Sequence, residues 1–392
     1  MELTAIQQAL REAGLDGWLF CDFHHRDPLA YSILGLDMAG MTTRRWFYFI
    51  PAAGEPVKLA HRVEPRKLAA LPGRQEYFSA WRELHDQLRA IVAGAKRVAM
   101  QYSPLNAIPY VATVDAGTVE LVRSFGPEIV SAADLVQQFE AVVGAEGWDS
   151  HRWAGERVQR IKDEAFERMG SALRAGRAID EHAVARFILE RFEQEGLTSD
   201  GDVPIVGFNE HPADPHFEPT ERNAKRLSAG DTILVDLWAR RREPPGVYYD
   251  ITWCGCAGEP PADYARIFAV VCRARDAAVD FVRARFAARQ ACHGYEVDDV
   301  ARAVVGDAGY GEAFVHRTGH SIGRRVHGNG ANIDNLETRD ARRLIPGTCF
   351  SIEPGIYLAE RMAVRAELDV FLTPAGGVEV YGPVQHELIR VG

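Results

Sequence analysis

The feature that most constrains this chain is a pair of aspartates set inside two stretches of apolar, strand-forming residues. Asp236 interrupts the run 232–238, and Asp250 interrupts the run 247–253. A buried carboxylate is costly unless it is paired or bound to a metal, and an acid in each of two neighbouring strands is a stronger signal than either alone. The polar, proline-containing segment 240–246 predicts a hairpin loop between the strands. The two acids are therefore expected close together, in surroundings that demand a partner.

Three more residues of metal-binding type follow in segments with the character of strands or strand edges. These are His320, Glu353 and Glu367, in segments where glycines bend the backbone. A mixed nitrogen and oxygen set suits a divalent transition metal better than calcium. Four carboxylates facing one another would repel, and two divalent ions about 3.5–4 Å apart would offset that charge while sharing an acidified water. The five residues therefore form one candidate ligand set: Asp236, Asp250, His320, Glu353 and Glu367.

The composition is that of a globular protein. The chain has 392 residues, which fits two domains, and its net charge of -10 disfavours a general nucleic-acid binder. No apolar run reaches the ~18 residues of a membrane-spanning helix, and the first residues lack signal-peptide character. The six cysteines are scattered, and the close pair Cys254 and Cys256 is expected on a strand rather than at a metal. A cytoplasmic, reduced protein without membrane or nucleic-acid partners is expected.

The first part of the chain predicts an α/β layer domain without a phosphate-binding fingerprint. Strands are expected near 18–21, 46–50, 57–60 and 98–100, and helices near 64–70 and 81–92. A further helix has capping-box spacing at Thr4 and ends at Gly14. The loop 24–27, with two histidines, an arginine and an aspartate, is interpreted as an ordinary polar loop.

A domain boundary is expected where a helix beginning after 131–134 ends near Gly144 and Gly147. The predicted domains are 1–145 and 146–392. The second contains predicted helices at 148–177, 261–289 and 297–306, and another capped by Asp180. Because helices and antiparallel strands are segregated there, its fold class is α+β.

Along essentially its whole length the chain resembles the M24-type pita-bread metallopeptidases, in the branch of Xaa-Pro dipeptidases (prolidases) and aminopeptidase P. The matching segments are Asp214–Pro215–His216, Asp236, Asp250–Ile251–Thr252, Gly319–His320–Ser321–Ile322–Gly323, Val326–His327, Ile352–Glu353–Pro354–Gly355–Ile356–Tyr357 and Val364–Arg365–Ala366–Glu367. The resemblance implies a pita-bread catalytic domain preceded by a creatinase-like N-terminal domain. Five ligands in the family's order make this resemblance specific.

The resemblance also implies a role for each ligand. Asp236 would chelate one metal ion, while Asp250 and Glu367 would bridge two. His320 and Glu353 would complete the second metal, and Glu353 would accept a proton from the bridging water. Manganese is the favoured metal, with zinc or cobalt as alternatives.

Four other residues match or adjoin the family's substrate-side positions. His216 and His327 would hold the scissile carbonyl and the tetrahedral intermediate. Arg365 would bind the substrate's terminal carboxylate, although it could instead pair with Asp369 or Glu367. His316 is either a partner of the site on its substrate side or only a turn residue.

The expected reaction is hydrolysis of the Xaa-Pro bond, mainly in dipeptides, by a metal-bridging hydroxide in a homodimeric enzyme. The alternatives are an aminopeptidase P acting on longer peptides, a metal-free creatinase-like hydrolase and a non-catalytic peptide-binding module. Intact carboxylate ligands argue against the last two. Departures from the family pattern, namely a longer loop between Asp236 and Asp250 and Tyr249 before the second aspartate, are expected to alter the substrate pocket.

Overall fold

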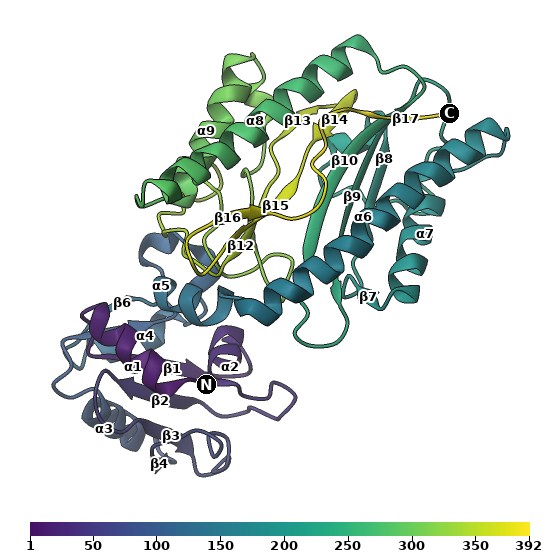
Figure 1. Cartoon of the computed structure of the whole chain (residues 1–392). Helices are drawn as coiled ribbons and strands as arrows, with labels where there is room; N and C mark the ends of the chain where they lie inside the picture. The colour runs from purple at the N-terminus through teal and green to yellow at the C-terminus, as the bar shows by residue number, and fades with distance from the viewer. The chain divides into compact units, whose positions relative to one another are not determined.

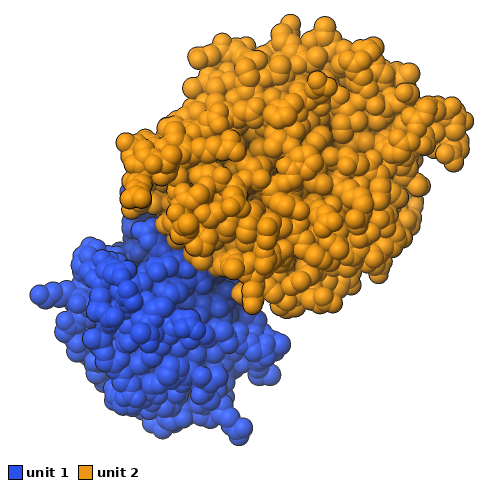
Figure 2. All heavy atoms as spheres, in the orientation of Figure 1, with its two compact units in different colours: residues 1–140 blue, residues 141–392 orange.

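The computed structural model describes all residues from 1 to 392 and divides into two compact units, 1–140 and 141–392 (Figure 2). Each unit has its own sheet and its own hydrophobic clusters, and the labels used below are those of Figure 1. No helix in the chain is both long enough and apolar enough to cross a membrane.

The first unit is built on one mixed six-stranded sheet in the order β4-β3-β2-β1-β5-β6. Its strands are β1 (Gly17–Asp22), β2 (Trp46–Pro51), β3 (Val57–His61), β4 (Arg74–Phe78), β5 (Arg97–Met100) and β6 (Glu128–Ser131). Its helical segments are α1 (Leu3–Glu12), α2 (Pro28–Leu34), α3 (Trp81–Ile91), η1 (Pro104–Asn106), η2 (Pro109–Val111), α4 (Ala116–Arg123), α5 (Ala133–Val136) and the π-helical turn η3 (Gln137–Ala141).

Both faces of this sheet are covered, which explains why its central strands β1 and β2 are nearly continuous apolar runs. In β1, Trp18 and Phe20 pack into a cluster with α1, α2 and α5, while Leu19 and Cys21 pack into a cluster with α3 and α4. The α/β layer predicted from the sequence is confirmed, including all four predicted strands.

Two local predictions in the first unit are wrong. The segment 64–70 is a series of turns, in which Lys67 N bonds Glu64 O and Ala69 N bonds Arg66 O, rather than a helix. Pro65 lies at its start, and the Glu64 side chain bonds the backbone of Thr43 instead of a helix end. Helix α1 begins at Leu3, so Thr4 lies inside the helix and caps nothing.

The second unit has a five-stranded sheet, a four-stranded sheet and a two-stranded hairpin. Its strands are β7 (Leu197–Thr198), β8 (Ile205–Phe208), β9 (Thr232–Arg241), β10 (Tyr249–Ala257), β11 (Ser321–Ile322), β12 (Cys349–Ile352), β13 (Gly355–Leu358), β14 (Met362–Arg365), β15 (Leu368–Leu372), β16 (Val378–Val380) and β17 (Ile389–Val391). Its helices are α6 (Gly144–Arg174), α7 (Glu181–Gln194), η4 (His211–Ala213), α8 (Ala262–Ala287), α9 (Gly294–Asp307) and η5 (Gly311–Ala313). The α+β class is confirmed.

The antiparallel register of β9 and β10 determines where their acids point. Asp236 lies opposite Thr252, and Asp250 lies opposite Trp238. Alternate residues of both strands, such as Val235 and Ile251, pack under α6 and α7. Because side chains alternate between the faces of a sheet, Asp236, Asp250 and Thr252 share the face that points away from α6 and α7. The predicted hairpin is confirmed.

The glycines at the expected helix end have a different role. Helix α5 and the π-helical turn η3 that continues it end at Ala141, close to Gly144 as predicted, and Gly144 begins the long helix α6, which contains Gly147. A Cβ on Gly147 would come within 2.8 Å of the Val143 side chain, so this position requires glycine for packing rather than for a linker. The helix predicted at 148–177 is thus α6, which starts four residues earlier and ends at Arg174.

Other predictions for the second unit are confirmed, with one correction. Asp180 caps α7 by accepting a hydrogen bond from Ala183 N, and all six cysteines are free and buried, with Cys254 and Cys256 on β10. Tyr249, however, points to the face under α6, where its hydroxyl donates to Tyr381 O. Its side chain therefore does not line the acidic face, contrary to the expectation that it alters a substrate pocket there.

Candidate metal centre

The five predicted ligands come from five different strands or strand ends of the second unit. Asp236 lies on β9 and Asp250 on β10, whereas His320 directly precedes β11, Glu353 directly follows β12 and Glu367 directly precedes β15. Four of the five are buried, and the Glu353 side chain is only 13% exposed. Residues spread over more than a hundred positions of sequence are therefore collected in one interior region.

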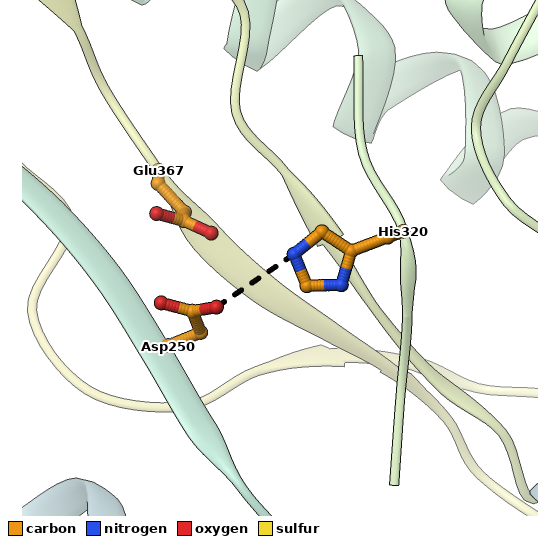
Figure 3. A group of neighbouring side chains, drawn as sticks. All are labelled: Asp250, His320 and Glu367. Carbon is orange, nitrogen blue, oxygen red and sulfur yellow. Dashed lines mark ion pairs between the residues drawn. The ribbon is translucent and has the colours of Figure 1, made fainter. Parts of the chain in front are cut away.

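Three of these residues form the tightest group. Asp250, His320 and Glu367 each offer one donor atom, and these atoms all lie within 4.8 Å of one another. Figure 3 shows the three side chains pointing toward a common point, with His320 Nε2 3.7 Å from Asp250 Oδ2. Glu353 adjoins the group, because its Oε1 lies 3.2 Å from the same histidine nitrogen.

Asp236 differs from the other carboxylates in being paired with an arginine. Its Oδ2 forms an ion pair with Arg365. Its Oδ1 is buried and has no hydrogen-bond partner, and the same is true of Asp250 Oδ1 and Glu367 Oε1. Buried carboxylate oxygens are rarely left unpaired, so three at one place indicate that a partner of positive charge belongs there. The donor set fits divalent metal ions.

The electrostatics of the group lead to the same conclusion. Burial, followed by the charges of neighbouring acids, raises the pKa of Asp250 and of Glu367 well above the usual range. Burial raises the pKa of Glu353 to about 7, while burial lowers the pKa of His320 well below its usual value. The protein alone thus disfavours the charged carboxylates and the protonated imidazole, whereas a bound divalent cation would favour carboxylate and neutral imidazole.

Two hydroxyl groups that the sequence analysis overlooked hold the ligands in place. Thr252 Oγ1 donates to Glu367 Oε2 at 2.7 Å and accepts a hydrogen bond from Arg365 Nε at 2.9 Å. Ser351 Oγ donates to Glu353 Oε1 and accepts from His320 N, both at 2.9 Å. Each hydroxyl therefore fixes two members of the site.

Asp369 is a further acidic residue beside the ligands, and its place there was not predicted from the sequence. Asp369 Oδ2 accepts a hydrogen bond from Asp250 N at 2.8 Å and lies 3.7 Å from His151 Nε2. The other nitrogen of that ring lies 2.6 Å from Tyr248 O. The alternation of strand β15 offered a signal, since Asp369 is two residues beyond Glu367 and therefore faces the same side.

Arg365 is buried at the centre of the polar network. It pairs with Asp236, donates to Tyr357 Oη at 2.9 Å, and its Nε lies 3.9 Å from Glu353. The suggestion that it pairs with Asp369 or Glu367 is therefore corrected. His316 Nε2 lies 2.8 Å from the same tyrosine hydroxyl, which links this histidine to the site through Tyr357.

The two histidines expected on the substrate side are placed differently. The His327 ring meets the His320 ring edge to face, with centroids 4.4 Å apart. His216 is exposed in the loop after η4. Burial raises the pKa of Asp236, and the charge of Arg365 is the main effect that opposes this rise. The structure brings His327 directly to the ligands, whereas His216 forms no hydrogen bond or ion pair with any of them.

Comparisons with known proteins agree with this arrangement. Residues 155–374 match the model of metallopeptidase family M24. The probable dipeptidase PepE of Mycobacterium tuberculosis is 33% identical over 347 residues, covering 87% of this chain and 84% of that protein. The structure of dipeptidase PepE from Mycobacterium ulcerans has a TM-score of 0.72 at 28% identity, covering 99% of this chain and 96% of that one. The structure of a dipeptidase from Pyrococcus horikoshii has a TM-score of 0.65 at 25% identity, with full coverage of both chains.

The fold and the buried donor group are those of a metallopeptidase. The chain belongs to metallopeptidase family M24. The resemblance seen in the sequence motifs is thereby confirmed, together with the pita-bread fold of the second unit.

Proposed function

We propose that this protein is a dinuclear metallo-dipeptidase that hydrolyses the bond between any residue and a following proline. The observation that carries the proposal is the group Asp250, His320 and Glu367 with Glu353 beside it, together with three buried carboxylate oxygens, on Asp236, Asp250 and Glu367, that have no hydrogen-bond partner. Relatives named dipeptidases, which align with most of the chain, support a dipeptide substrate. The proline preference is supported by the sequence motifs shared with the proline-peptidase branch.

The residues would divide between two ions. Asp236 would hold one ion, Asp250 and Glu367 would contact both, and His320 with Glu353 would hold the other. Bound divalent ions, with manganese favoured over zinc or cobalt, supply an acidified water and polarise the carbonyl under attack. Glu353 would accept the proton of the attacking water, with Ser351 holding its Oε1 in position.

The remaining residues would act on the peptide. His327 and His216 would orient the scissile carbonyl and stabilise the charge that develops on it. Arg365 would attract the terminal carboxylate of the substrate. Its guanidinium already donates hydrogen bonds to Asp236, Thr252 and Tyr357. The substrate carboxylate would therefore share these donors with the three residues. His316 would support this end of the site through Tyr357.

An aminopeptidase P activity on longer peptides is the second candidate, because it uses the same ligands. A metal-free creatinase-like hydrolase and a non-catalytic binding module are less favoured, since neither explains five intact donors. The division into a creatinase-like domain at 1–145 and a catalytic domain at 146–392, assembly as a homodimer and a cytoplasmic location belong to the same proposal.

The first prediction concerns metal and substrate together. Chelator treatment is expected to abolish hydrolysis of alanyl-proline, and added Mn²⁺ is expected to restore it. Without bound cations, three of the buried carboxylate oxygens of the site have no partner. Alanyl-prolyl-alanine and alanyl-alanine should be cleaved at least about tenfold less efficiently, a difference of roughly 1.4 kcal/mol in transition-state binding. The measurement is kcat/KM for each peptide by separation of the products.

The peptide panel distinguishes the alternatives. Faster cleavage of the tripeptide would favour aminopeptidase P, and equal cleavage of alanyl-alanine would remove the proline preference. Activity that survives complete chelation would rule out the metal mechanism, provided that metal analysis confirms the loss of bound ions.

The second prediction concerns the hydroxyl of Thr252. Replacing it with valine keeps the side-chain shape but removes the donor to Glu367 and the acceptor for Arg365. Loss of such an outer partner typically costs about 10–100-fold in metal affinity or activity, and that range is expected for Thr252→Val. Competition with a chelator of known affinity would measure it.

Thr232→Val on the neighbouring strand β9 is the matched control. Thr232 is also buried, but it lies opposite Cys256, at the end of the ladder away from the ligands. If both variants lose metal affinity equally, the effect comes from altered sheet packing and not from the hydroxyl of Thr252.

A further inference from the structure

The first unit contains a cavity that has no part in the metal centre. Its volume is about 310 Å³, which is the lower end of the range for small-molecule sites. It lies where β1 ends, β2 begins and α4 begins. Its wall contains three acids, two arginines and two aromatic rings: Asp22, Asp27, Asp115, Arg26, Arg45, Phe23 and Phe47. The loop 24–27, interpreted from the sequence as an ordinary polar loop, forms part of this wall.

Asp27 is the unusual residue of the wall. Its Oδ1 caps α2 by accepting from Ala30 N and also accepts from Thr113 Oγ1 at 2.9 Å. Its Oδ2 is buried without any hydrogen-bond partner, and the residue is only 1% exposed. Burial raises the pKa of Asp27 to about 7, with the hydrogen bond from Ala30 opposing the rise. The protein thus leaves one carboxylate oxygen in need of a donor.

The other two acids of the cavity are already satisfied. Asp22 accepts hydrogen bonds from His25 N, Asp27 N and Tyr31 Oη. Asp115 caps α4 through two bonds from Thr118. Of the three acids, only Asp27 therefore has a buried carboxylate oxygen without a hydrogen-bond partner.

Two guanidinium groups in the same wall also have spare donors. Arg45 makes no hydrogen bond or ion pair within the chain, although it is not fully exposed. Arg26 lies 5.4 Å from the centroid of the Phe23 ring and likewise forms no ion pair. Arginine presents a planar fork of donors that matches a carboxylate, so the pair offers a receptor for one.

We propose that this cavity binds a free α-amino acid. The ammonium group would donate to Asp27 Oδ2, the carboxylate would lie against Arg45 and Arg26, and the side chain would pack on Phe23 and Phe47. A simple anion would face three acids, and a simple cation would face two guanidinium groups. A zwitterion satisfies both sets of groups at once.

The inference does not depend on the proposed catalytic activity, because it rests only on residues of the first unit. A dipeptidase would nevertheless release molecules of this class. If both proposals hold, the cavity would let the protein respond to the products of peptide hydrolysis.

Isothermal titration calorimetry of the full chain with individual amino acids, starting with leucine, phenylalanine and proline, tests the inference. At least one is expected to bind with a millimolar or tighter dissociation constant. Arg45→Met should weaken that binding at least about tenfold, since it removes charge-assisted hydrogen bonds. Arg44→Met is the matched control, because Arg44 is exposed, its side chain bonds only Thr43, and it does not line the cavity.

Two further comparisons distinguish this cavity from the metal centre. Binding should persist in Asp250→Asn, and the carboxylic acid that lacks the amino group of the bound ligand should bind much more weakly. Arg45→Met should leave peptide hydrolysis unchanged in the absence of added amino acid.

Three results would overturn the proposal: no binding of any amino acid tested, equal binding by the Arg45→Met variant, or binding that is lost only in Asp250→Asn. Equal affinity for the deaminated acid would also contradict it, because Asp27 would then have no role. None of these outcomes depends on whether the chain cleaves dipeptides.

Discussion

Replacing Asp250 with asparagine is expected to remove metal-dependent hydrolysis and, at the same time, to stabilise the metal-free protein. Asp250 is buried, its Oδ1 has no partner, and its pKa is raised by burial and by the neighbouring acids. As a proposed metal ligand it should be essential, with a loss in kcat/KM of about a thousandfold or more, equivalent to roughly 4 kcal/mol. Without metal, a neutral amide in its place should raise the unfolding free energy by about 1–3 kcal/mol.

The expected loss of activity together with a gain in unfolding free energy distinguishes this substitution from one that merely disrupts the fold. A variant that is simply misfolded would be less stable both with and without metal, whereas Asp250→Asn should lose only the stabilisation gained on adding Mn²⁺. Thermal unfolding with and without the ion measures both effects. Asp280→Asn is the control, because Asp280 is 74% exposed on α8 and pairs only with Arg283; it should behave like the wild type.

Replacing Arg365 with methionine should lower the free energy of unfolding more than any of the other substitutions proposed above. The Arg365 side chain is 5% exposed and compensates Asp236 while bonding Thr252 and Tyr357. Removing one partner of a buried ion pair leaves an uncompensated charge, which costs about 3–5 kcal/mol. Denaturant unfolding of the metal-free protein should show this loss, and bound metal should recover part of it. Lysine at this position keeps the charge but cannot reach all three partners, so an intermediate value is expected.

An exposed arginine just before strand β14 provides the control. Arg361 precedes the strand, is 60% exposed and pairs with Asp263 at 3.0 Å. Exposed ion pairs contribute little, so Arg361→Met should change the unfolding free energy by no more than about 1 kcal/mol. An unchanged stability of Arg365→Met would contradict the central place given to this residue in the charge balance.

Two of the proposed ligands could be singled out from the sequence because each breaks a local rule. An aspartate in an apolar strand is costly, so Asp236 and Asp250 stand out against their neighbours. The hairpin between them then determines the register, and the register determines the shared face. His320, Glu353 and Glu367 required the resemblance as well, because nothing local shows that their strands converge.

The supporting residues could not be predicted in the same way. Thr252 and Ser351 are hydroxyl residues on strands, where such residues are common and carry no cost that marks them. His151 comes from α6, nearly a hundred residues before Asp250, and meets Asp369 only through the packing of that helix. Their roles follow from tertiary distances alone.

The incorrect local predictions have equally specific causes. The segment 64–70 has helix-forming residues, but the Glu64 side chain bonds Thr43 and the chain forms successive turns. Gly144 and Gly147 suggested a break because glycine usually punctuates helices, and a break does lie between Ala141 and Gly144, whereas Gly147 is inside α6. In the structure Gly147 instead permits close packing against Val143 and Val247.

The most direct test of the account is the number of metal ions bound to the active protein. Purified protein loaded with Mn²⁺, freed of excess ion and assayed for alanyl-proline hydrolysis, should contain about two ions per chain by plasma mass spectrometry, as a site of this donor count requires. Activity should rise with occupancy and fall to background as the ions are withdrawn. Full hydrolysis by protein that contains no bound metal would contradict the two-metal site proposed for Asp236, Asp250, His320, Glu353 and Glu367.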